Sequence, residues 1–221
     1  MNRVKLFTIL LLSICISSKE LLAQSYLEFV ENKGQWDNNI AFQGRLGNGS
    51  FVIKKDGGYR MVLHDAADLT KLAKYYHGEE VNTNNSPIVL HSHAYEVKFL
   101  NANTNAVAVP DKKLNTYNNY FIGNDKTKWA SNCAVYQAIT YKNVYHNVDI
   151  RYYTSSSGQL KYDIIVNPGG ALDKIALYFD GVQNLKVKEG SLSVQTSVNE
   201  VKELPPVSYA LEEQGTNPVE C

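Results

Sequence analysis

The sequence has few cysteines, no excess of either charge, and no long apolar run after its N-terminal segment. Three cysteines occur in 221 residues, and only Cys133 and Cys221 lie beyond that segment. Two cysteines make neither a disulfide framework nor, by themselves, a metal site. Two interpretations stay open, a Cys133–Cys221 bridge or two thiols, and we favour the thiols because cysteine often packs as a small apolar side chain.

Charge and motifs exclude or disfavour several classes of function. Lys and Arg number 22, as do Asp and Glu, so the basic excess that neutralises phosphates is missing and we expect no nucleic-acid partner. The sequence has no Gly-x-Ser-x-Gly elbow, Gly-rich phosphate loop, His-Glu-x-x-His or Cys-x-x-Cys motif. We therefore expect no enzyme activity and no cofactor.

The first 23 residues have the pattern of a secretory signal peptide. Arg3 and Lys5 precede an apolar run at 6–16 that is too short to span a bilayer, and Ala23 offers a small residue for cleavage. Removing residues 1–23 takes away three of 22 basic and one of 22 acidic residues, which leaves a formal net charge of −2. We expect a secreted or cell-surface protein that makes no membrane contact after cleavage.

From residue 24 onward, apolar residues recur with period two, which is typical of half-buried strands. Residues 50–63 predict two strands around an Asp-Gly-Gly turn. In the strand predicted at 93–100, Tyr95, Val97 and Phe99 share one face. The pattern favours an all-β fold, an antiparallel β-sandwich or open barrel formed by residues 24–221 as one domain. Further strands are predicted at 148–166 (a hairpin), 174–179, 185–194 (a tight hairpin) and from 205.

One or two short helices interrupt the strands. Residues 65–78 predict an amphipathic helix with Asp65 as N-cap, and Leu69, Leu72, Ala73 and Tyr76 fall on one face. A second helical turn is expected in "NNYFIGNDKTKW", residues 118–129. There Gly123 supplies a permissive backbone, Asn124 or Asp125 can cap the turn, and Trp129 can fold back on the strand. No nucleophile–base pair occurs in this stretch, so we interpret it as a scaffold corner.

The hairpin at 148–166 raises a catalytic hypothesis. If Tyr153 lies opposite Gln159, one face is apolar and the other places Asp149 opposite Asp163 and Arg151 opposite Lys161. Two carboxylates across a sheet can serve as acid and base in glycoside hydrolysis. The commoner use of such residues is a solvated face with compensating ion pairs, which we favour.

Two further residue sets suggest binding. His91 and His93 in "HSH" would share a strand face, but a zinc site needs more ligands than two, so we expect no metal site. Aromatic side chains could line a sugar- or protein-binding surface, although core filling is the commoner role. The candidate ligand contacts are Trp36, Tyr120, Trp129, Tyr145 and Tyr153.

Five segments in order resemble a known family: "FVENKGQW" (29–36), "NYFIGND" with "KW" (119–129), "YKNVYHNVDIRYY" (141–153), "LKYDIIVNPG" (160–169) and "PPVSYA" (205–210). They resemble an N-terminal domain of unknown function of secreted and surface proteins of Bacteroidetes. The motif residues to which we give structural roles are Gly34, Trp36, Phe121, Gly123, Asn124, Tyr145, Asp149, Tyr162 and Asp163.

The resemblance implies an extracellular module that commonly precedes SBBP-type β-propeller repeats and a C-terminal sorting domain of the gliding-motility type, with export by type IX secretion. It supplies no catalytic residues. Family members continue past "PVSYA", so we expect a module cut at its C-terminal end.

We therefore predict a non-catalytic β-rich module for adhesion or assembly. Its partners would be neighbouring domains and surface glycans or proteins. The alternatives are a carbohydrate-binding module that uses the aromatics and a glycan hydrolase that uses Asp149 and Asp163.

Overall fold

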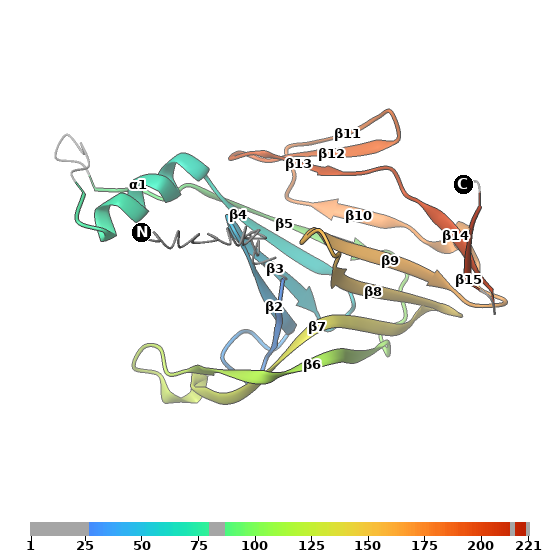
Figure 1. Cartoon of the computed structure of the whole chain (residues 1–221), viewed down its shortest axis with the longest axis horizontal. Coiled ribbons are helices and arrows are strands. Elements are labelled where there is room, and N and C mark those ends of the chain that lie inside the picture. The colour runs from blue at the N-terminus through green and yellow to red at the C-terminus, as the bar shows by residue number, and fades with distance from the viewer. Residues whose placement is uncertain (1–26, 80–86, 213–214, 220–221) are drawn as a thin grey trace, which may run out of the picture.

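The computed structural model describes residues 27–79, 87–212 and 215–219, and antiparallel strands dominate it (Figure 1). The predicted signal peptide and Cys221 lie outside these residues. No helix in the described part of the chain is long and apolar enough to cross a membrane.

Ten strands form one sheet that curls into a half-barrel, which confirms the all-β, open-barrel prediction. Its path is β10-β5-β4-β3-β2-β1-β7-β8-β9, and β6 pairs with β7. The strands are β1 (Phe29–Glu31), β2 (Ile40–Leu46), β3 (Gly49–Lys54), β4 (Tyr59–His64), β5 (Ser92–Phe99), β6 (Val107–Tyr120), β7 (Ala130–Tyr145), β8 (Val148–Thr154), β9 (Leu160–Val166) and β10 (Leu177–Asp180).

Two smaller sheets follow in the chain. One joins β11 (Asn184–Lys188), β12 (Ser191–Gln195) and β13 (Glu200–Glu203), and the other joins β14 (Ser208–Glu212) and β15 (Gly215–Val219). The tight hairpin predicted at 185–194 is confirmed, and its turn residues Glu189 and Gly190 have φ angles of 52° and 75°. Val194 of β12 is fully buried in the main core, so the three-stranded sheet covers part of the half-barrel.

Strand β7 is the junction of the large sheet. Strand β6 pairs along one of its edges, while β1 and then β8 pair along the other. The sheet therefore divides into two branches, and these fold onto each other. The Tyr152 ring of β8 lies 5.5 Å from Phe51 of β3 and 6.1 Å from Tyr59 of β4.

Buried tyrosines hold the two branches together through their hydroxyl groups. The Tyr141 hydroxyl donates to the Lys54 carbonyl at 2.8 Å, and the Tyr152 hydroxyl donates to the Gly57 carbonyl at 2.6 Å. Both bonds connect the β7–β8 branch to the β3–β4 turn. A phenol buries a large apolar ring and still satisfies its polar tip, which explains a core rich in tyrosine.

The predicted helix is present as α1 (Ala66–Tyr76), with Asp65 as N-cap accepting from the Asp68 amide. Its predicted apolar face is only partly buried: Leu69 and Leu72 are half-buried, whereas Tyr76 is 77% exposed. The helix is instead attached by its first turn, where the buried Asp68 carboxylate bonds the backbone and side chain of His91.

Two local predictions are wrong. Strand β10 begins at Leu177, because residues 172–174 form a 3₁₀ turn where a strand was expected from 174. The β8–β9 register is shifted by two residues, so Tyr153 lies opposite Lys161. The connecting loop closes around Gly158, whose φ of 80° suits glycine. A shift of two leaves every side chain on its predicted face.

Candidate functional site

The hairpin of β6 and β7 forms an arm at the lower edge of the molecule in Figure 1, and its connecting loop projects away from the other strands. Strand β1 pairs with β7 only at Val135 and Tyr136. Residues 130–134 of β7 therefore pair only with β6 among the described residues. We call residues 113–134 the arm and residues 121–129 its tip.

Large apolar side chains are exposed at the tip. Phe121 is 59% exposed, Ile122 77% and Trp129 38%. The Phe121 and Trp129 rings pack edge to face with centroids 5.7 Å apart, and the Lys126 ammonium lies 5.7 Å from the Trp129 ring. The tip thus presents a small aromatic and aliphatic surface next to a positive charge.

Hydrogen bonds fix the conformation of the tip. The Trp129 indole N–H donates to the Gly123 carbonyl at 3.2 Å, and Gly123 adopts a φ of 73°. Asp125 caps the 3₁₀ turn Lys126–Lys128 by accepting from the Thr127 amide. The predicted helical turn and the folded-back Trp129 are confirmed, and of the two expected caps it is Asp125, and not Asn124, that bonds the turn.

The arm rests on a second, small core. Val30, Ala130, Cys133 and Val135 are buried there, with Trp36, Leu114 and Tyr120 packed against them. The Trp36 and Tyr120 rings meet edge to face at 5.2 Å. Three of the predicted ligand contacts, Trp36, Tyr120 and Trp129, therefore belong to one end of the molecule.

The loop between β1 and β2 holds Trp36 against the arm through Asn32. The Asn32 side-chain oxygen accepts from the Gly34 and Trp36 amides, and its nitrogen donates to the Ile40 carbonyl. Gly34 allows this turn with a φ of 111°. Sequence analysis missed Asn32; its only signal was an Asn two residues before Gly, a pattern typical of Asx turns.

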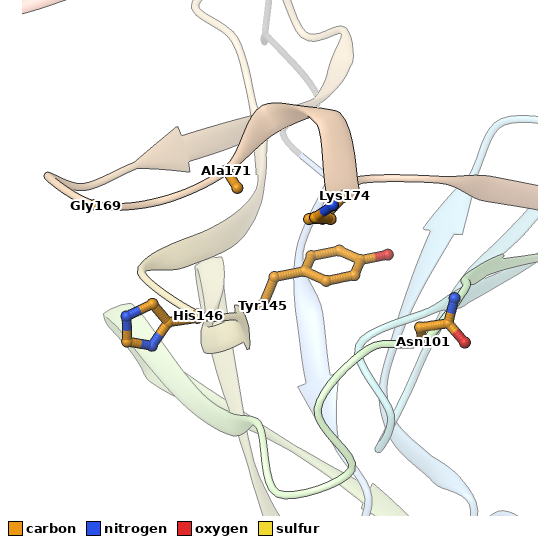
Figure 2. A pocket seen from close by; sticks show the side chains of 6 residues that line it. All are labelled: Asn101, Tyr145, His146, Gly169, Ala171 and Lys174. Atoms are coloured by element: carbon orange, nitrogen blue, oxygen red, sulfur yellow. The ribbon is translucent and has the colours of Figure 1, made fainter.

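Tyr145, a fourth predicted contact, lines a separate shallow pocket of about 300 Å³ (Figure 2). The pocket lies where the loop after β5, the β7–β8 turn and the β9–β10 connection meet. Figure 2 shows Asn101 and His146 on either side of the Tyr145 ring. The ring is 8% exposed and its hydroxyl donates to the Leu100 carbonyl at 2.7 Å, so Tyr145 fixes the loop after β5.

Tyr153, the fifth predicted contact, lies on the outer face of β8. Its hydroxyl donates to Asp163 at 3.1 Å, and burial together with the Asp163 charge raises its pKa to about 12. Arg151, directly opposite Asp163, bonds Asp111 of β6 at 2.9 Å. Ion pairs and hydrogen bonds connect the side chains of this outer face, as we expected for a solvated face.

Asp149 lies opposite Ile165, and not opposite Asp163 as predicted. Its carboxylate is 5% exposed and accepts from Lys142 at 2.6 Å and from the Asn143 amide at 2.8 Å. Burial by itself would raise the pKa of Asp149, but these bonds outweigh it and the pKa lies below the usual value. A general acid for glycoside hydrolysis needs a raised pKa, so the two bonds that keep Asp149 ionised oppose that role.

His91 and His93 contact other parts of the fold, and Cys133 lies in its core. His91 bonds Asp68 at 2.6 Å, while His93 contacts the Gly181 carbonyl and Ser197, so the two rings have different partners. The described residues contain no group of three or more acidic, His or Cys side chains placed to hold a metal. Cys133 is fully buried as a free thiol, and burial raises its pKa.

Sequence analysis also missed Glu203, which ties the three-stranded sheet to both branches of the half-barrel. Its two carboxylate oxygens accept from Tyr59 of β4 at 3.1 Å and from Tyr162 of β9 at 3.0 Å. Nothing in the local sequence around Glu203 marks this role, because both partners are distant in the chain.

Comparison with known proteins gave one match. A family model described as Domain of unknown function (DUF7948) matches residues 29–221, which includes the arm, the Trp36 loop and Glu203. No curated protein and no solved structure matches the chain.

Proposed function

The chain belongs to this family of unknown function, and from that premise we propose that it is a non-catalytic β-rich module of a larger extracellular protein, which acts in adhesion or assembly. The proposal places it at the bacterial surface or outside the cell, after export of a precursor cleaved near Ala23. It extends to the Bacteroidetes setting, with SBBP-type repeats and a gliding-motility-type sorting domain as neighbours. The signal-like N-terminus and the family resemblance support this setting.

The exposed tip of the arm is the observation that carries the proposal. Burying Phe121, Ile122 and Trp129 against a partner would remove apolar surface from water, at about 25 cal/mol per Å². The Gly123–Trp129 hydrogen bond and the Asp125 cap hold the tip in one conformation, so little ordering entropy is lost on binding. Rigid aromatic anchors of this kind are typical of protein interfaces.

The ring geometry favours a protein partner over a sugar. A sugar that stacks across a pair of aromatic rings needs the two rings to be nearly coplanar. The Phe121–Trp129 and Trp36–Tyr120 pairs have interplanar angles of 68° and 67°, so neither pair offers such a platform. The Lys126 ammonium lies beside the Trp129 ring, which suits an apolar groove with an acidic rim.

Site-specific photocross-linking in the native cells tests the proposal. A photoreactive amino acid at position 122 should give a covalent adduct with a discrete protein. The matched control is position 187 on β11, because Val187 is 76% exposed and Ile122 is 77% exposed. A Phe121→Ser change should abolish the adduct at 122. Equal adduct yields at 122 and 187, or none at 122, would contradict docking through the tip.

A further inference from the structure

A hollow of about 560 Å³ opens on the arm, away from the tip. It is lined by Lys113, Leu114, Asn115, Thr116, Tyr117, Asn132 and Ala134. Its volume lies in the range of small-molecule sites in proteins.

A bulge in β6 creates the hollow. Lys113 pairs with Tyr136 and Tyr117 pairs with Ala134, so three residues, 114–116, stand opposite Val135 alone. Leu114 turns inward and packs on the small core, which anchors the bulge. Bulges of this kind re-aim side chains and are common beside binding sites.

Asn132 forms the opposite wall in a fixed conformation. Its φ is 54°, in the left-handed region that Asn tolerates better than most residues. Its backbone N–H donates to the Asn119 side-chain oxygen at 2.9 Å, and its backbone carbonyl accepts from the Lys33 ammonium at 2.9 Å. Asn119 and Lys33 thus hold the Asn132 backbone in place, while the Asn132 side-chain amide at the hollow has no hydrogen-bond partner among the described residues.

Four side chains around the hollow are available to a ligand. Asn115, Thr116 and Asn132 offer amide and hydroxyl groups that both donate and accept, and Tyr117 is 57% exposed. Among the described residues no carboxylate lines the hollow, and the one charged group there is the Lys113 ammonium, a hydrogen-bond donor. Sugars combine an apolar C–H face, which packs on an aromatic ring, with adjacent hydroxyls, which pair with amides.

From this combination we propose that the hollow binds a pyranose unit of a neutral oligosaccharide, with the sugar ring against Tyr117 and its hydroxyls on Asn115, Thr116 and Asn132. This site is distinct from the aromatic residues at the tip and goes beyond protein docking there. It uses one isolated ring and does not need coplanar pairs.

The test is an array of immobilised neutral oligosaccharides of glucose, galactose, mannose and xylose, with uronate oligosaccharides and peptides alongside. The purified protein should bind at least one neutral oligosaccharide saturably, and calorimetry with that compound gives the affinity. Tyr117→Ala and Asn132→Gly should each weaken binding by about tenfold or more. Glycine keeps the left-handed backbone at 132 and removes only the side chain.

The matched control is Tyr75→Ala on α1, since Tyr75 is 59% exposed and lies outside the arm. It should leave the affinity for the sugar unchanged. Ile122→Ser at the tip should also leave that affinity unchanged, so the experiment tests the sugar site independently of docking through the tip. Circular dichroism checks folding, and Asn115→Ala replaces any variant that does not fold. The proposal is overturned by no neutral-sugar binding, by binding to uronates or peptides alone, or by binding that survives both Tyr117→Ala and Asn132→Gly.

Discussion

Replacing Glu203 by alanine should loosen the attachment of the three-stranded sheet to the half-barrel. Glu203 accepts hydrogen bonds from Tyr59 and Tyr162, which come from opposite branches of the large sheet. Burial and the Glu203 charge both raise the pKa of Tyr59, so the phenol stays neutral and donates. The substitution removes the acceptor for both hydroxyls at once.

The expected loss follows from the burial of the two donors. A hydrogen bond to a charged group contributes about 1.5–3 kcal/mol, and a buried hydroxyl left without a partner costs about 1–3 kcal/mol. Tyr59 is 4% exposed and would lose its partner fully, whereas the half-buried Glu203 is partly screened by water. We therefore expect a loss of about 2–4 kcal/mol in the free energy of unfolding, or roughly 5–15 °C in Tm for a chain of this size.

Urea unfolding followed by tyrosine fluorescence and by far-UV circular dichroism measures this loss. Glu200→Ala is the matched control, because Glu200 lies on the same strand, is exposed, and among the described residues accepts a side-chain hydrogen bond from the nearby Ser193 alone. It should change the free energy by less than about 0.5 kcal/mol. In a background with Tyr59→Phe and Tyr162→Phe, Glu203→Ala should cost less than about 1 kcal/mol, because no hydroxyl is left unpaired.

Two results would refute this reasoning. One is a Glu203→Ala variant as stable as Glu200→Ala. The other is a loss of equal size in the single variant and in the Phe background, which would show that the two tyrosine hydroxyls do not couple to Glu203.

The remaining predictions concern single positions. Asp149→Asn should cost about 1–3 kcal/mol at neutral pH by urea unfolding, because it weakens the bonds from Lys142. The pKa of Asp149 is lowered, so the stability that the carboxylate contributes is present above the usual Asp pKa and should be lost as pH falls through the lowered value. A difference in unfolding free energy between wild type and variant that does not change in acid would contradict this. Gly49→Ala should cost about 3 kcal/mol in thermal melts, because a Cβ there would lie 1.9 Å from the Val62 carbonyl oxygen; an unchanged Tm would show that the strand yields. Tyr153 has a raised pKa of about 12, so its contribution is complete below the unfolded value of 10.0 and should be lost as pH rises toward 12. Alkaline unfolding should therefore be less steep in Tyr153→Phe, and identical curves would refute this.

The burial pattern of the tyrosines explains why the aromatic content was ambiguous in sequence. Tyr141, Tyr145 and Tyr152 are buried with hydroxyls on backbone carbonyls, whereas Tyr75 and Tyr117 are more than half exposed. All five are the same residue type in amphipathic segments. Only the fold decides which of them face the core.

The local sequence by itself determined the elements and their faces. Alternation placed Tyr95, Val97 and Phe99 on one buried face, since side chains of a strand point alternately to its two sides. Asp65 predicted the helix start because its carboxylate can satisfy a free amide of the first turn. These features depend on residues a few positions apart, so local chemistry is enough to fix them.

Tertiary structure decided register, partners and the candidate sites. A period of two cannot distinguish registers that differ by two residues, so the β8–β9 pairing was set by loop geometry, which placed Asp149 opposite Ile165 and not opposite Asp163. Trp36 meets Tyr120, and Glu203 meets Tyr59, across long stretches of chain. Alternation specifies which face a residue occupies but not which distant segment lies against it, because that choice belongs to the packing of the whole sheet.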